Sequence, residues 1–177
     1  MKELKKLFKK KSFQELIDLA KIKSSNNKDT LEYQEIMADS YMALEKNFLA
    51  IEVYEKIIKI EKSNPELFNK LGIAYKSAGN FKNAEINFLK SLDIKSDQST
   101  AIFNLGVIHF QKNNFHEAQK YLDNLIKIKP DFILGYIFYG KTLFSLNDFN
   151  RAKEIYQKGL KFNPDSEDLK VGLSEVY

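Results

Sequence analysis

Small residues recur along this chain at a fixed interval of 34 residues. Gly72, Gly106 and Gly140 mark the interval, and Ala38 extends it by one step toward the N-terminus. A second series keeps the same interval and consists of Ala50, Ala84, Ala118 and Ala152. Self-similarity with a period of this size is typical of proteins built from stacked structural repeats. We therefore expect the chain to fold by stacking similar short units.

The residues around the small positions indicate what one unit looks like. The second repeat contains, in order, Phe68, Leu71, Gly72, Tyr75, Ala84 and Phe88. This pattern resembles the W-x2-L-G-x2-Y and A-x3-F signature of the tetratricopeptide repeats, with Phe in place of Trp. The resemblance implies an all-α fold, a right-handed superhelical solenoid of helix-turn-helix repeats.

The pattern predicts four repeats with degenerate ends in a single solenoid domain. The repeats span residues 31–64, 65–98, 99–132 and 133–164, between N-terminal capping helices or a degenerate repeat in 1–30 and a C-terminal capping helix in 165–177. The first repeat departs most from the pattern. Its Phe48 lies two residues before Ala50, whereas Phe115 lies three before Ala118. We expect an altered turn in the first repeat.

Residue types that carry catalysis or bind metals are scarce. The chain has no cysteine, which excludes thiol catalysis and cysteine-based zinc sites. Its two histidines, His109 and His116, complete no metal-binding motif, and no glycine-rich phosphate loop or nucleophile elbow occurs. We expect a protein that is not an enzyme and that needs no cofactor or metal.

The charge is basic, but its composition does not favour nucleic acid. The net charge is +4, and Arg151 is the single arginine among 28 basic residues. Arginine is the commonest reader of guanine edges and suits phosphates, so the lysine excess fits an A/T-rich genome better, and we expect a bacterial, cytoplasmic protein. A basic N-terminal segment contains Lys2, Lys5, Lys6, Lys9, Lys10 and Lys11 around Leu4, Leu7 and Phe8. We favour a capping role for it over an anionic membrane surface or nucleic acid.

The resemblance also implies where a partner lies, because in this family the first helices line a concave groove that usually holds the ligand. In the third and fourth repeats the candidate partner-binding residues are Phe103, Asn104, Val107, Phe110, Leu134, Ile137, Lys141 and Phe144. In the first and second repeats they are Glu32, Glu35, Asp39, Glu66 and Asn69. The groove therefore changes from acidic to apolar, and we expect the acidic part to recognise a basic stretch of the same partner.

The apolar part of the groove exceeds what helix packing requires, so it needs an occupant. Three alternatives remain: a segment of a partner protein, the chain's own C-terminal helix through Leu169, Leu173 and Val176, or a second copy of the chain. The pattern of co-chaperones that clamp a C-terminal carboxylate is not met. Of the positions concerned, Asn69, Ile73, Asn104, Leu134 and Phe138, only Asn104 matches.

Together these features predict a non-catalytic protein-interaction scaffold that binds a segment of a partner protein. Two other roles stay open at this point. The chain could be a chaperone for a secretion or assembly subunit, or a regulatory or membrane-surface subunit of an enzyme complex.

Overall fold

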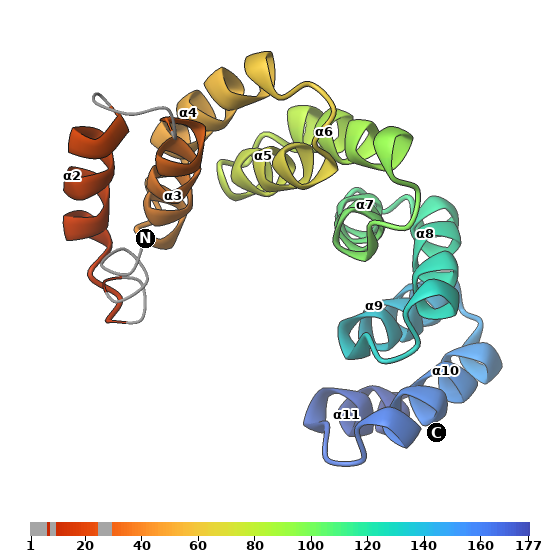
Figure 1. Ribbon diagram of the computed structural model, residues 1–177. Helices are drawn as coiled ribbons and strands as arrows, with labels where there is room; N and C mark the ends of the chain where they lie inside the picture. Colours follow the sequence, from red (N-terminus) through yellow and green to blue (C-terminus); the bar gives the residue numbers. More distant parts are fainter. Residues whose placement is uncertain (1–6, 8–9, 25–29) are drawn as a thin grey trace. The chain divides into compact units, whose positions relative to one another are not determined.

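The computed structural model describes residues 7, 10–24 and 30–177. All secondary-structure elements assigned in this part of the chain are α-helices (Figure 1). The helices are α2 (Phe13–Ser24), α3 (Thr30–Ala43), α4 (Asn47–Ile60), α5 (Pro65–Ser77), α6 (Phe81–Ile94), α7 (Ser99–Gln111), α8 (Phe115–Ile128), α9 (Ile133–Ser145), α10 (Phe149–Phe162) and α11 (Glu167–Glu175). The all-α helical-repeat fold is confirmed. Most of the basic N-terminal segment, residues 1–6 and 8–9, lies outside the described residues.

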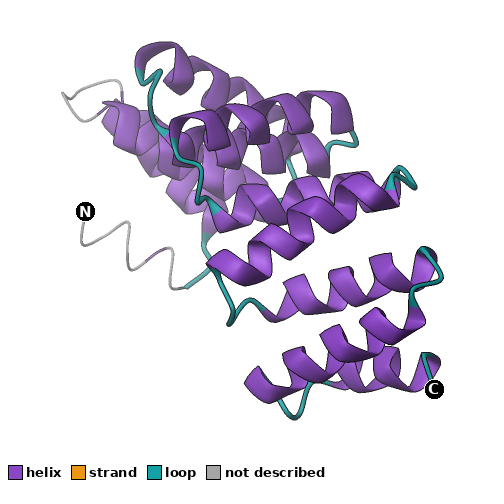
Figure 2. Ribbon diagram, turned by 90° about the vertical axis from the view of Figure 1, so that its right-hand side faces the viewer, coloured by secondary structure: helices purple, strands orange, loops and turns teal. Residues whose placement is uncertain are grey.

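The chain forms two compact units, which are described separately. Unit 1 covers residues 1–94 and contains α2 to α6, and unit 2 covers residues 95–177 and contains α7 to α11. Within each unit, consecutive helices pack against one another, and from α3 to α6 and from α7 to α11 short loops join them (Figure 2). Each predicted repeat supplies a first helix (α3, α5, α7 or α9) and a second helix (α4, α6, α8 or α10).

The glycine series marks the contact between the two helices of a repeat. A Cβ atom on Gly72 would lie 2.7 Å from the ring of Phe88, and one on Gly106 would lie 2.8 Å from Cγ of Leu122. A larger residue at either position would overlap the second helix, because protein interiors are close-packed. The 34-residue interval therefore records where two helices approach, as the sequence predicted.

The turn inside each repeat contains one residue in the left-handed region. These residues are Glu45 (φ 57°), Gly79 (φ 77°), Asn113 (φ 59°) and Asn147 (φ 59°). The following amide closes the turn alike in the first two repeats, since Lys46 N donates to Tyr41 O and Asn80 N to Tyr75 O, both at 2.9 Å.

The expected altered turn in the first repeat is therefore wrong. The backbone of this turn follows the same path as in the other repeats. The one-residue shift of the aromatic residue shows instead in the exposure of its side chain. Phe48 is 77% exposed.

Helix α11 extends unit 2 by packing on α9 and α10. Leu169 is fully buried, and a Cβ atom on Gly159 would lie 2.9 Å from its Cδ1. Gly172 lies against the ring of Tyr156 in the same way. The helix thus occupies the place of a further first helix. Its buried apolar residue, Leu169, packs against α10 and does not fill the concave groove predicted from the sequence.

Candidate functional site

The first helices of unit 2 carry a connected group of aromatic rings. The ring centroid of Phe103 lies 5.1 Å from that of Phe132 and 5.5 Å from that of Phe138. Phe110 continues the group, at 5.9 Å from Phe138 and 5.6 Å from Phe115. Tilted and edge-to-face pairs at these distances are favourable. We call Phe103, Phe110, Phe132 and Phe138, together with Leu134 and Phe144 of α9, the aromatic face; the ring of Phe144 pairs separately with that of Phe149, at 5.2 Å.

The charged groups at the aromatic face are two lysines and one carboxylate, that of Asp131. Lys129 Nζ lies 5.6 Å from the ring centroid of Phe132, and Lys141 Nζ lies 5.9 Å from that of Phe138. Helices α7 and α9 contain no Asp or Glu. A hollow of about 260 Å³ opens beside the face and is lined by Lys129, Asp131, Phe132, Ile133 and Leu134. The face therefore offers apolar rings with ammonium groups beside them.

The predicted contact residues of unit 2 divide into two groups. Leu134 and Phe144 are 48% and 38% exposed, Lys141 is exposed, and Phe103 and Phe110 are half-buried. Asn104, Val107 and Ile137 are only 4%, 6% and 4% exposed.

Helix packing covers the second group, and Asn104 Nδ2 donates to Thr100 O of its own helix at 2.9 Å. Asn104, Val107 and Ile137 thus offer little surface to a partner, contrary to the sequence expectation. For the other residues, partner binding stays a prediction.

Phe132 and Phe138 belong to the aromatic face but were not among the predicted contact residues. Phe132 lies in the loop before α9, at a position for which the repeat pattern specifies no residue type. Phe138 falls 34 residues after Asn104 and 68 after Lys70. Lys70 and Phe138, at this recurring position, contact the preceding first helix. The spacing could therefore have identified Phe138 as a residue of the same surface as Phe103.

In unit 1 the corresponding helices, α3 and α5, carry an ion-pair cluster. Lys70 Nζ lies 2.7 Å from Glu35 Oε1 and 2.7 Å from Asp39 Oδ2. Tyr54, which is 1% exposed, donates its hydroxyl to the carboxylate of Asp39. We call Glu35, Asp39, Tyr54 and Lys70 the Lys70 cluster.

The cluster shifts the pKa values of its members. Burial alone would lower the pKa of Lys70, but its hydrogen bonds to Asp39 and Glu35 and their negative charges outweigh burial and raise it. Burial, followed by the charge of Asp39 and the hydrogen bond to it, raises the pKa of Tyr54 far above its ordinary value. At neutral pH the lysine is charged and the tyrosine is neutral.

The cluster reduces the acidic charge expected of the first two repeats but does not remove it. Lys70 pairs with both Glu35 and Asp39, so the three side chains together keep one net negative charge. Glu32 and Glu66 are exposed and Asn69 is half-buried, and none of the three belongs to the Lys70 cluster as defined above. Binding of a partner by these residues stays a prediction.

The described residues offer neither a metal-binding cluster nor a membrane-spanning helix. In that part of the chain, no three or more His, Cys, Asp or Glu side chains gather as metal ligands would. Among the helices described, none combines the length and the apolar character needed to cross a membrane.

Solved structures with this fold include proteins known to bind peptides. The chain is similar to MamA (TM-score 0.84, 20% identity, covering 93% of this chain and 96% of that one). It is similar to YrrB, described as a TPR protein with an unusual peptide-binding site (TM-score 0.78, 15% identity, 97% and 88% covered). It also resembles the first TPR of Spaghetti (RPAP3) bound to the HSP90 peptide SRMEEVD (TM-score 0.61, 18% identity, 64% and 90% covered). These likenesses show the fold.

Sequence models of one family match most of the chain, although no curated protein sequence matches it. A model described as TPR repeat matches residues 38–79, and two models described as Tetratricopeptide repeat match residues 99–132 and residues 65–98 and 135–166. The matches to residues 65–98, 99–132 and 135–166 follow the pairs α5–α6, α7–α8 and α9–α10, in which Gly72, Gly106 and Gly140 contact the second helix, and the match to residues 38–79 runs from α3 through α5. The chain therefore belongs to the tetratricopeptide-repeat family.

Proposed function

We propose that this chain is a non-catalytic scaffold that holds a segment of a partner protein on the aromatic face of unit 2. Its repeats support a role in protein interaction. The observation that carries the more specific proposal is the connected ring group of α7 and α9, with Leu134 and Phe144 left substantially exposed beside it. Exposed apolar patches of this kind mark interaction surfaces.

The charges at the face favour one kind of segment. Lys129 and Lys141 lie over ring faces, and α7 and α9 carry no carboxylate, so the one carboxylate at the face, that of Asp131, is outnumbered by two ammonium groups. A segment with apolar side chains and carboxylates fits better.

The affinity of such a contact is modest. Burying two to four large side chains yields about 1.5–3 kcal/mol each, and association entropy removes much of the sum. A dissociation constant that is roughly micromolar or weaker follows.

The peptide bound by Spaghetti is not a suitable ligand model for this chain. Three of the positions used by carboxylate-clamping repeats hold Ile73, Leu134 and Phe138 here, and none of these supplies a charged or amide group. The aromatic face therefore calls for a different ligand chemistry from that of a clamped terminal carboxylate.

The test is capture of partners from native cell lysate with crosslinking. We expect the double variant Leu134→Glu with Phe144→Glu to lose one protein that the unaltered chain captures. Ile128→Glu is the matched control, because Ile128 is 42% exposed but lies at the end of a second helix. Circular dichroism checks that each variant folds.

An unchanged captured set in the double variant would contradict the proposal. The identity of a lost protein would also decide between the finer roles, namely a chaperone for a secretion or assembly subunit and a subunit of an enzyme complex.

A further inference from the structure

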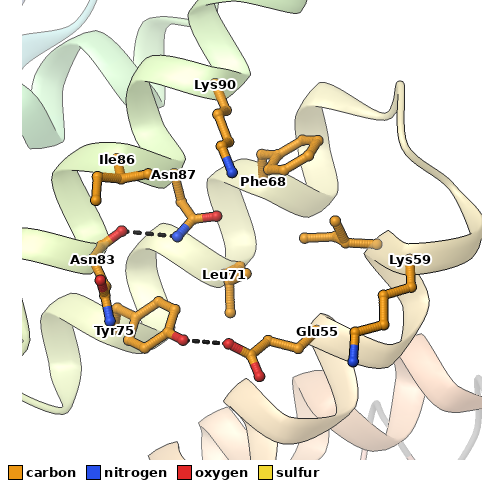
Figure 3. A pocket seen from close by; sticks show the side chains of 10 residues that line it. Glu55, Lys59, Phe68, Leu71, Tyr75, Asn83, Ile86, Asn87 and Lys90 are labelled. Atoms are coloured by element: carbon orange, nitrogen blue, oxygen red, sulfur yellow. Dashed lines mark hydrogen bonds between the residues drawn. The ribbon is translucent and has the colours of Figure 1, made fainter.

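A second hollow lies in unit 1 and shares no residue with the aromatic face (Figure 3). Its volume is about 380 Å³, within the range of pockets that hold small ligands or single large side chains. It opens over α5 between the second helices α4 and α6. Its lining residues, which define the second-helix pocket, are Glu55, Ile58, Lys59, Phe68, Leu71, Tyr75, Asn83, Ile86, Asn87 and Lys90.

The floor of the second-helix pocket is apolar. Phe68 and Leu71 of α5 are 7% and 4% exposed, so they present only small parts of their surfaces into the hollow. Ile86 on α6 is 41% exposed and forms part of the rim. An apolar side chain entering the pocket would cover these surfaces and gain from their removal from water.

Two lysines stand at the rim without a carboxylate partner. Figure 3 places Lys59 and Lys90 at different sides of the pocket, and neither forms an ion pair within the described residues. Lys90 Nζ lies 5.8 Å from the ring centroid of Phe68.

The carboxylate of Glu55 is already engaged, because it accepts a hydrogen bond from the hydroxyl of Tyr75. Burial, with the hydrogen bond and charge of Glu55, raises the pKa of Tyr75 to about 12, so this donor stays protonated at neutral pH.

The equivalent place in unit 2 is occupied by the chain's own charges. Lys127, 68 residues after Lys59, pairs with Asp123 at 2.5 Å. Arg151, 68 residues after Asn83, donates to the hydroxyl of Tyr139 at 3.0 Å. In unit 1 the shorter Asn83 stands where the arginine is, and Glu55 bonds Tyr75 while Lys59 is left without an ion pair. The second-helix pocket is thus net positive, and it differs from its counterpart in that Lys127 and Arg151 are held there by Asp123 and Tyr139.

We propose that the second-helix pocket binds a segment of a partner protein that inserts one large apolar side chain with a carboxylate beside it. The side chain lies on Phe68 and Leu71, and the carboxylate pairs with Lys59 and Lys90. The proposal is independent of the aromatic face, and together the two surfaces let one chain hold two segments.

Nuclear magnetic resonance of the full ¹⁵N-labelled chain tests this with two peptides. The first is acetyl-Gly-Glu-Trp-Glu-Gly-amide, and the second has Gln in place of both Glu residues. We expect the first peptide to shift the side-chain amide signals of Asn83 and Asn87. We expect about fivefold weaker binding of the second peptide, and of the first peptide to the variant Lys59→Gln with Lys90→Gln.

Lys82→Gln is the matched control, because Lys82 is an exposed lysine of α6 outside the pocket. It should bind the first peptide like the unaltered chain, and so should Leu134→Glu, which tests the aromatic face separately.

Equal affinity for both peptides, undiminished binding by the double lysine variant, or shifts confined to α7 and α9 would overturn the proposal. So would shifts at the pocket that depend on protein concentration without peptide, because these would assign it to a second copy of the chain.

Discussion

Lys70 in unit 1 and Phe138 in unit 2 occupy the same position in their repeats and contact the preceding first helix in the same way. Each reaches the residue 35 positions earlier: Lys70 Nζ lies 2.7 Å from a carboxylate oxygen of Glu35, and the ring of Phe138 lies 5.5 Å from that of Phe103. One contact is ionic and the other is aromatic. The repeat fixes the geometry of this position and leaves its chemistry free.

The difference decides what each face offers. In the Lys70 cluster one ammonium group pairs with both carboxylates, which leaves one net negative charge but no carboxylate without a cation beside it. The aromatic face buries its apolar side chains only in part, because Leu134 and Phe144 remain exposed to solvent. We therefore expect the first helices of unit 1 to contribute stability and those of unit 2 to contribute binding.

The largest expected effects concern the framework that both units share. Gly72→Leu in unit 1 and Gly106→Leu in unit 2 should each lower the free energy of unfolding by about 1–3 kcal/mol or more, because the new side chain overlaps Phe88 or Leu122. Urea denaturation measures this. Gln111→Leu, at an exposed position of α7, is the control and should stay within about 0.5 kcal/mol. An unchanged stability in either glycine variant would show that the assigned helix contact is wrong.

A lysine pair tests the comparison directly. Lys70→Met should cost about 1–2 kcal/mol, because Glu35 and Asp39 lose their cation while only partly exposed, and solvent screens some of the loss. Lys141→Met should cost less than about 0.5 kcal/mol, since Lys141 is exposed and α9 holds no carboxylate. Chemical denaturation of both variants gives the two values. Equal costs would remove the contrast between the faces.

Alkaline pH should act on both units alike. Burial raises the pKa of Tyr54, and burial together with the charge of Glu175 raises that of Tyr156 to about 12. A tyrosine whose folded pKa is raised contributes stability that is fully present below its unfolded pKa of about 10 and is lost as pH rises toward the folded value.

The free energy of unfolding should therefore fall above about pH 10, by up to about 1.4 kcal/mol per pH unit for each such tyrosine. Tyr54→Phe and Tyr156→Phe should each flatten this fall, and by similar amounts up to about pH 12. Denaturation curves at several pH values measure the slopes. If only the variant in unit 1 flattened the fall, tyrosine burial would belong to the Lys70 cluster and not to the shared framework.

The smallest expected effect lies in the turns. Glu45 adopts φ 57° where the following repeats have Gly79, Asn113 and Asn147, and a Cβ atom is unfavourable in this region. Glu45→Gly should stabilise the chain by about 0.5 kcal/mol, as judged from the thermal midpoint. Asn113→Gly in unit 2 serves as the reference and should change stability by a few tenths at most, because Asn tolerates this conformation. A destabilised Glu45→Gly variant would mean that the side chain of Glu45 compensates for its strain.

The fold was predictable from sequence because small residues at a fixed interval are directly tied to close helix approach. Gly72 and Gly106 leave the space that the side chains of Phe88 and Leu122 fill. Spacing of this kind survives wide changes in the other residues, so the helix pairs could be placed without knowing their surfaces.

The surfaces were harder to predict, because they depend on contacts between repeats. Glu35 and Asp39 share one face of α3 and look like solvated acids, but their partner Lys70 comes from the next repeat. Val107 and Ile137 look like groove residues on a helical wheel, but helix packing covers them. A pattern within one helix does not carry this information.

The contact between glycine and a large side chain has a consequence for how this sequence changes over generations. Residues 106 and 122 share one fixed space, so a gain of volume at one site is tolerated only with a loss at the other. Tyr156 extends the constraint to two partners, because both Gly140 and Gly172 lie against its ring. Such sites should vary in a compensating manner among descendants of this chain, and a duplication that copies one helix without its mate would inherit half of a matched pair.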